Sequence, residues 1–94
     1  MIRLSVLYPQ TEGAKFDHDY YRNHHIPMAA KAFGAEAEID RGLDGPYVAA
    51  AHFRFASQDA LTAAMGSSDT AAVLADVPNY TTITPVLQTS EIVD

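Results

Sequence analysis

The stretch 16-FDHDYYRNHHIPM-28 holds three of the chain's four histidines and two of its five tyrosines, a mixture that a purely structural helix does not need. Tyr21 and His25 are four residues apart, so they are neighbours on one face of a helix. Tyr20 and His24 form a second row at the same spacing. Because adjacent helical residues diverge by about 100°, the two rows face different surroundings. We take His25 as the leading candidate and His24 as a secondary one.

A proline shapes the end of this stretch. Pro27 lacks a backbone N–H and disfavours the helical conformation at the residue before it. We therefore predict a helix over residues 17–24, a kink, and a second helical piece over residues 27–33 that Gly34 ends. His25 then lies at a helix boundary, where its side chain can face a pocket.

The pair of Tyr21 and His25 allows two interpretations. A histidine has an unperturbed pKa of about 6.5, which suits general acid–base catalysis of a bound small molecule. Tyr21 would orient His25 or act as a second donor. Alternatively, the pair caps the kinked helix and bonds the backbone groups that Pro27 leaves free. Both interpretations stay open at this point.

Composition limits the class of protein. The 94 residues fit a single domain, 1–94, and 48% of them are hydrophobic, as in folded globular proteins. The net charge of −6 argues against nucleic acid and anionic membranes as partners, since both need clustered Lys and Arg. No apolar run approaches the roughly twenty residues of a membrane helix, and no signal-peptide core follows Arg3. The chain has no cysteine, which excludes disulfides and thiolate chemistry. We therefore expect a cytoplasmic protein without a nucleic-acid or membrane partner.

The order of the elements predicts the fold. Strand-like runs cover residues 2–8, 36–42, 47–55 and 81–93, and two further helical runs cover residues 57–65 and 68–74. With the first helical run, the order is β-α-β-β-α-β, the ferredoxin-like α+β arrangement with a four-stranded antiparallel sheet. Glu38 and Asp40 line one side of the second strand, which suits an edge. Pro85 predicts that the last strand is also an edge, bent at that residue. The first and third strands are then central.

The third strand predicts a homodimer. Its two faces carry Tyr47, Ala49, Ala51, Phe53 and Phe55 on one side and Val48, Ala50, His52, Arg54 and Ala56 on the other. Two helices cover only one face of the sheet, so small apolar groups on the other face need a second copy to cover them. We predict that His52 and Arg54 line a cavity there, with Tyr8 as a weaker candidate. A lone buried histidine is more often a satisfied structural group, and that alternative also stays open for His52.

Three segments carry a family resemblance. Tyr21-x-x-x-His25-x-Pro27 resembles the signature of the EthD family, while residues 1–9 and 76–81 resemble its opening strand and its run into the last strand. The resemblance implies a dimeric α/β barrel built from two ferredoxin-like domains. Superfamily relatives include polyketide cyclases, lactone isomerases and cofactor-independent monooxygenases, and EthD itself suggests an accessory role in oxidative degradation.

We therefore expect a small EthD-like protein that binds an apolar or aromatic metabolite. It would act as a cofactor-independent oxidoreductase or as an isomerase or cyclase; the alternative is a non-catalytic accessory binding or assembly module. The candidate residues are His25 and Tyr21 for catalysis and His52, Tyr8, His24 and Arg54 for substrate binding. No cofactor is expected. The spacing of His24 and His25, which does not put two imidazoles on one helix face, argues against a metal site; a cluster of His25, His52 and an aspartate is the alternative that stays open. An enzyme should place His25 or His52 at a void, which an assembly module would fill.

Overall fold

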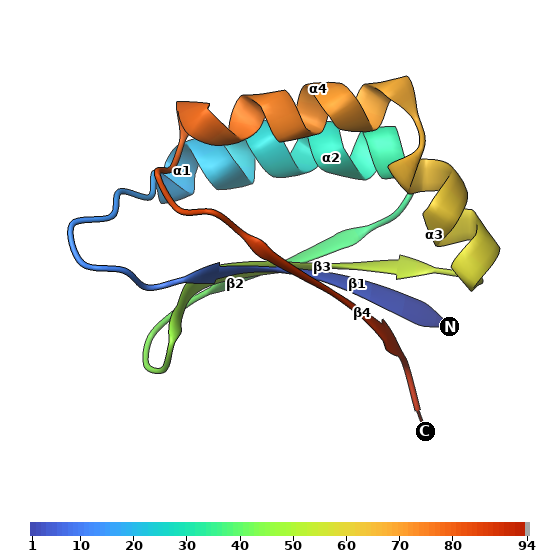
Figure 1. The fold of residues 1–94 in the computed structure, drawn as a ribbon, viewed down its shortest axis with the longest axis horizontal. Coiled ribbons are helices and arrows are strands. Elements are labelled where there is room, and N and C mark those ends of the chain that lie inside the picture. The colour runs from blue at the N-terminus through green and yellow to red at the C-terminus, as the bar shows by residue number, and fades with distance from the viewer. Residues whose placement is uncertain (94) are drawn as a thin grey trace.

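The chain folds as a helix layer on a four-stranded antiparallel sheet (Figure 1). The structure is a computed structural model and describes residues 1–93. The strands are β1 (Ile2–Pro9), β2 (Ala37–Arg41), β3 (Tyr47–Phe55) and β4 (Val86–Glu91). They are ordered β2-β3-β1-β4, so β1 and β3 are central and β2 and β4 are edges. This confirms the ferredoxin-like α+β fold and the strand order that the sequence predicts.

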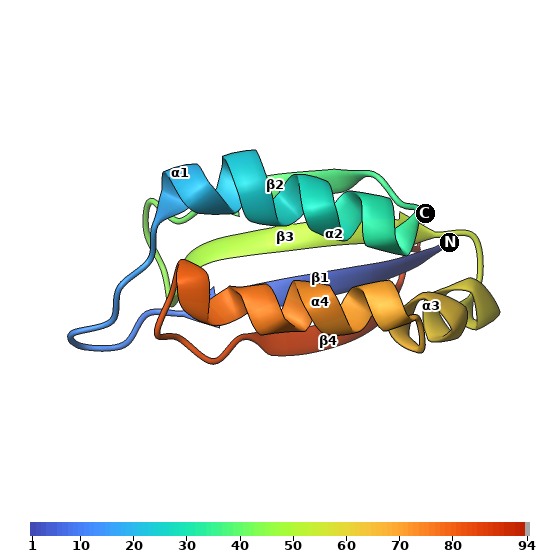
Figure 2. The ribbon, with the colours of Figure 1, turned by 90° about the horizontal axis from the view of Figure 1, so that it is seen from above.

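The helix layer consists of two runs. The first comprises α1 (His18–Tyr20), the π-helical turn η1 (Tyr21–His25) and α2 (Ile26–Phe33); the second comprises α3 (Gln58–Met65), α4 (Ser68–Asp76) and the 3₁₀ turn η2 (Val77–Asn79). The helices α1, α3 and α4 are capped at their N-termini by Asp17, Ser57 and Ser67. Each of these side chains accepts a hydrogen bond from a backbone N–H of the first turn. The helices α2 and α4 lie side by side and run in opposite directions (Figure 2). The end of α4 therefore lies beside the start of the first run.

In place of the kink predicted between two helical pieces, the structure has a π-helical turn directly before Ile26 and Pro27. The chain passes from α1 through η1 into α2 without leaving a helical conformation, and the N–H of Ile26 bonds the carbonyl of Tyr21, five residues back. Pro27 lies in the first turn of α2 and has no N–H to donate to the turn before it, so the helix lacks one bond at this point. The turn is widened instead of broken, and such π-helical turns are frequent at functional sites.

The two faces of the sheet differ, because successive strand residues point to opposite sides. Leu4 of β1 pairs with Phe53 of β3, and both are buried beneath the helices. Ser5 and His52 form the next pair and lie on the face that no helix covers. The core therefore lies between the helix layer and one face of the sheet.

The last strand is shorter than predicted. It begins at Val86, so Pro85 precedes β4 and does not bend it. Proline cannot donate to a ladder, and the start of a strand is one of the few positions that tolerate it. Thr81, the predicted start, makes only an isolated bridge with Phe16. Within residues 1–93, no helix is both long and apolar enough to cross a membrane.

Candidate functional site

A cavity of about 310 Å³ lies between the helices and the sheet. Its wall is largely apolar and includes Leu4, Val6, Ile26, Ala29, Phe33, Ala51, Phe53, Val73 and Leu87. The polar residues that line it are Tyr8, Tyr21, His25, Thr70 and Thr84. None of the residues that line the cavity carries a formal charge when His25 is neutral, so the cavity suits a neutral ligand with few polar atoms.

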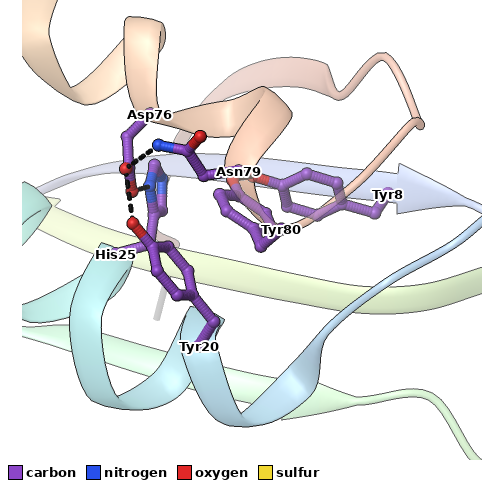
Figure 3. Close-up of polar contacts among 6 residues, drawn as sticks. All are labelled: Tyr8, Tyr20, His25, Asp76, Asn79 and Tyr80. Carbon is purple, nitrogen blue, oxygen red and sulfur yellow. Dashed lines mark hydrogen bonds and ion pairs between the residues drawn. The ribbon is translucent and has the colours of Figure 1, made fainter.

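His25 is held by a carboxylate from the second helical run. Only 4% of the His25 surface is exposed, and its Nδ1 atom lies 3.0 Å from Oδ2 of Asp76 at the end of α4. Tyr20 and Asn79 donate to the other oxygen of Asp76, at 2.7 and 2.9 Å (Figure 3). Asp76, at the end of α4, is thus hydrogen-bonded to one residue each of α1, η1 and η2.

The protonation state of this group follows from its surroundings. Burial lowers the pKa of His25 below its usual value, although Asp76 opposes that change. Burial alone would raise the pKa of Asp76, but hydrogen bonds from Asn79, His25 and Tyr20 outweigh it and hold the pKa below its usual range. At neutral pH His25 is therefore uncharged and Asp76 is ionised. Since a carboxylate only accepts hydrogen bonds, Nδ1 carries the proton and Nε2 keeps a free lone pair.

Tyrosine rings surround His25. Tyr21 stacks on His25 with ring centroids 5.6 Å apart and planes 14° apart. The Tyr80 ring lies 4.5 Å from the His25 ring, and the hydroxyls of Tyr8 and Tyr80 are 2.5 Å apart. The hydroxyl of Tyr21 is buried and has no hydrogen-bond partner among residues 1–93. The imidazole therefore lies in a closely packed cluster of tyrosine rings, two of which, Tyr8 and Tyr21, also line the cavity.

The predicted site residues fall into a group that lines the cavity and a group that does not. Tyr8, Tyr21 and His25 come together at the cavity. His24 is exposed and stacks on Tyr20, with ring centroids 5.0 Å apart, and does not line the cavity. The first group belongs to β1 and η1, which the ferredoxin-like topology brings face to face.

His52 and Arg54 do not line the cavity that contains His25. On the uncovered face of the sheet, Nε2 of His52 donates to Asp40 at 3.0 Å, and Nδ1 of His52 lies 2.8 Å from the hydroxyl of Ser5. Arg54 lies on the same face, 3.9 Å from Glu38. The physical reason is the alternation of β3, which turns His52 away from the helices while its neighbours line the cavity. His52 is a hydrogen-bonded group of the sheet surface in this structure.

The sequence reasoning missed Asp76, Tyr20, Asn79 and Tyr80. Asp76 is 51 residues from His25, and no local pattern joins them. A topological signal existed, because antiparallel helices in this fold bring the end of the second helical run beside the start of the first. A carboxylate at that end, just before Pro78, was therefore a candidate partner for the histidine. Among residues 1–93, no group of three or more metal-ligating side chains is arranged to hold a metal ion.

Fold and site together define a ferredoxin-like α+β domain with a ligand-sized cavity in its core. The chain belongs to the EthD domain family, whose model matches residues 10–84.

Solved structures agree with this assignment. An EthD-like protein from Ralstonia eutropha JMP134 is 42% identical, with a TM-score of 0.90 over 99% of this chain and 92% of that chain. An ethyl tert-butyl ether D (EthD) family protein from Bacillus halodurans C-125 is 21% identical, with a TM-score of 0.79 over 99% of both chains. A dimeric ferredoxin-like protein of unknown function from Thermobifida fusca YX is 18% identical, with a TM-score of 0.63 over 97% of this chain and 90% of that chain. The last two likenesses show the fold alone. No curated protein matches the chain.

Proposed function

We propose that this protein binds a neutral, mainly apolar or aromatic small molecule in its cavity and moves a proton of that molecule with His25 as the base. The observation that carries the proposal is the geometry of His25. Asp76 holds the Nδ1–H, which leaves Nε2 as the basic atom of a histidine that lines the cavity. A carboxylate that fixes the tautomer of a catalytic histidine is a recurring arrangement in enzymes.

The chemistry needs only a bound substrate with an acidic proton. His25 Nε2 takes the proton, and Asp76 stabilises the imidazolium that forms. Returning the proton to a different atom gives an isomerase. If the deprotonated carbon instead attacks a carbonyl carbon of the same substrate, the C=O π pair moves to oxygen, which takes the proton from the imidazolium, and the protein acts as a cyclase. The same deprotonated substrate can also react with molecular oxygen, which would make the protein a cofactor-independent oxidoreductase. Proton abstraction is the step common to these reactions.

A non-catalytic binding module is the second candidate. The apolar cavity supports ligand binding in either case, whereas the histidine–carboxylate pair supports catalysis. A module that binds without chemistry would need the cavity but not the Nε2 lone pair. Binding and turnover must therefore be measured separately.

The proposed unit is a homodimer. The uncovered face of the sheet carries Leu7, Val48 and Ala50 and has no helix to shield it. The Thermobifida fusca relative is described as dimeric, which supports the same assembly here. The cavity lies inside one protomer on the opposite face, so each copy would hold its own ligand.

The binding test uses neutral bicyclic compounds and a variant that fills the cavity. Naphthalene, 2-naphthol and 1-tetralone are titrated while the melting temperature is followed, since a ligand that binds the folded state raises it. Ala51 lines the cavity and is fully buried. Ala51→Leu should remove the ligand-induced rise, while the exposed His24→Ala control should keep it. No rise with any of the three compounds in the wild-type protein would contradict the proposal.

A further inference from the structure

The cavity between the helices and the sheet reaches the surface of the protein. Three large apolar residues that line it are also exposed: Met65 at 36%, Leu74 at 59% and Leu87 at 54%. A side chain that lines a cavity and is also exposed lies where the cavity meets solvent. The cavity therefore has a mouth, and we call Met65, Leu74 and Leu87 its rim.

The fold accounts for the position of this mouth. Leu74 belongs to α4, which lies over the half of the sheet that β1 and β4 form (Figure 2). Leu87 of β4 pairs with Val6 of β1, so both side chains are on the face that the helices cover, and both line the cavity. In the sheet that residues 1–93 form, no strand lies beyond β4. The mouth thus lies at the β4 edge of the sheet, beneath α4.

The surface next to this mouth is apolar where a protein surface is normally polar. Residues 71–75 of α4 are AAVLA, and all of them except Val73 are exposed. The outer face of a surface helix usually carries charged or polar side chains. This chain has twelve acidic residues, yet none of them falls in this segment. Contiguous exposed apolar surface marks a place where an apolar group binds.

The interior of the cavity and its rim differ in the kind of apolar group that they present. Tyr8, Tyr21 and Phe53 line the cavity and are each only 1% exposed, so the aromatic part of the wall lies inside. The rim, in contrast, consists of two leucines and a methionine. Aromatic side chains favour edge-to-face or offset contacts with another ring, whereas the rim offers aliphatic contacts only.

The geometry points to a ligand that is longer than the cavity: an aromatic ring that lies inside, with a straight alkyl chain that leaves through the mouth between Leu74 and Leu87. This inference rests on the proposed function of the cavity and adds the kind of substituent that the ligand carries. The occupant of the rim is part of the ligand, because the apolar rim is continuous with the wall of the cavity. Covering Leu74 and Leu87 with an alkyl chain removes apolar surface from water, which is favourable.

The volume of the cavity separates ligands that end inside from ligands that reach the rim. An apolar cavity of about 150 Å³ holds one benzene ring, and this cavity is about 310 Å³. One ring therefore fills about half of the volume, and the other half holds roughly six further carbon atoms. In a 4-alkylphenol, a hexyl chain would fill the cavity, and the last carbons of an octyl chain would lie in the mouth.

The test measures how affinity depends on the length of the chain. Ethyl-, butyl-, hexyl- and octylphenol, each substituted at carbon 4, are titrated calorimetrically into the wild-type protein below their solubility limits. A fully buried methylene group raises affinity about fourfold, and a half-buried one about twofold. The affinity should therefore still rise about fourfold from the hexyl to the octyl compound, with one molecule bound per chain. A cavity without a usable mouth would give no rise at this step.

Variants of the rim locate the alkyl chain. Leu74→Ser and Leu87→Ser each replace an apolar side chain of the rim by a small polar one, so each should roughly halve the rise from hexyl to octyl, and the double variant should abolish it. Leu43→Ser is the matched control. Leu43 is 95% exposed between β2 and β3 and does not line the cavity, so this variant should keep the full rise.

The outcomes separate this inference from the proposed function. If the ethyl and butyl compounds bind but affinity does not rise from hexyl to octyl, the cavity binds ligands and the inference is overturned, as it would be if a second copy of the chain covered the mouth. A full rise in the double variant would overturn the role of Leu74 and Leu87. If none of the four compounds binds, the proposed function fails together with the inference. If a rim variant does not fold, the comparison of hexyl and octyl compounds in the wild-type protein decides.

Discussion

Asp76 Oδ2 lies 3.0 Å from Nδ1 of His25, and this contact joins the end of α4 to the π-helical turn of the first helical run. It leaves the second imidazole nitrogen of His25, a residue that lines the cavity, without a hydrogen-bond partner among residues 1–93. The two residues are far apart in the sequence, so the site exists only in the folded chain.

The first prediction concerns Asp76→Asn. An amide has nearly the same shape as the carboxylate but no charge, so the pKa of His25 should fall further, because Asp76 opposes the effect of burial in the wild-type protein. The side-chain amide can also donate to Nδ1, which would favour the opposite tautomer. Nitrogen NMR of the imidazole should show Nδ1 protonated in the wild-type protein at pH 7. The same tautomer and pKa in both proteins would show that Asp76 does not set them.

The second prediction concerns stability against pH. Because the folded-state pKa of His25 lies below its ordinary value of 6.5, the unfolded chain binds the proton more readily. The contribution of His25 to the free energy of unfolding is therefore fully present above about pH 6.5. It is lost as the pH falls toward the folded-state pKa of His25. The contribution of Asp76 is lost at lower pH, as its carboxylate takes up a proton below its ordinary value of 3.8. Urea unfolding between pH 8 and 4 should show the first loss in the wild-type protein and a smaller one in His25→Gln.

His18 is the control for this experiment. The pKa of His18 is also lowered, mainly by partial burial, but His18 lies outside the cavity and does not touch Asp76. The His18→Gln variant should still lose most of the stability that the wild-type protein loses on acidification. If His18→Gln and His25→Gln reduce this pH dependence of stability equally, the loss does not come specifically from the His25–Asp76 site.

Several parts of this structure were predictable from local residues. Asp40 and Pro85 identified the two edge strands because an acidic edge and a proline are poorly compatible with a central strand. Ser57 marked the start of a helix through its capping oxygen. Tyr21 and His25 came to one wall because a helix brings residues four apart together.

The remaining features depend on long-range contacts. Asp76 reaches His25 only when two antiparallel helices pack, and no local pattern reports that contact. His52 lies on a strand with small apolar residues on both faces, so the sequence alone did not show which face the helices cover. The effect of Pro27 was overestimated, because a widened turn accommodates the proline without a break.

The third prediction concerns the uncovered face of the sheet. Ala50 lies at its centre, beside Asp40 and Leu7 in the neighbouring strands. If two copies pack through this face, Ala50→Glu should separate them, since it adds an unpaired charge beside an existing carboxylate. Sedimentation should give a dimer for the wild-type protein at micromolar concentration and a monomer for Ala50→Glu. A wild-type protein that sediments as a monomer would refute the proposed assembly.

The proton-transfer role of His25 is tested most directly by the pH dependence of hydrogen exchange at the carbon next to the carbonyl of 1-tetralone. The exchange is followed by NMR in D₂O with and without protein. The wild-type rate should rise with pH as His25 loses its proton and reach a plateau before pH 7, because the pKa of His25 is lowered. His25→Gln should lose about 10²–10⁴-fold of the protein-dependent rate, the usual contribution of general acid–base catalysis. A His25→Gln protein that exchanges the proton at the wild-type rate at every pH, or a wild-type protein that adds nothing to the buffer rate, would contradict the account.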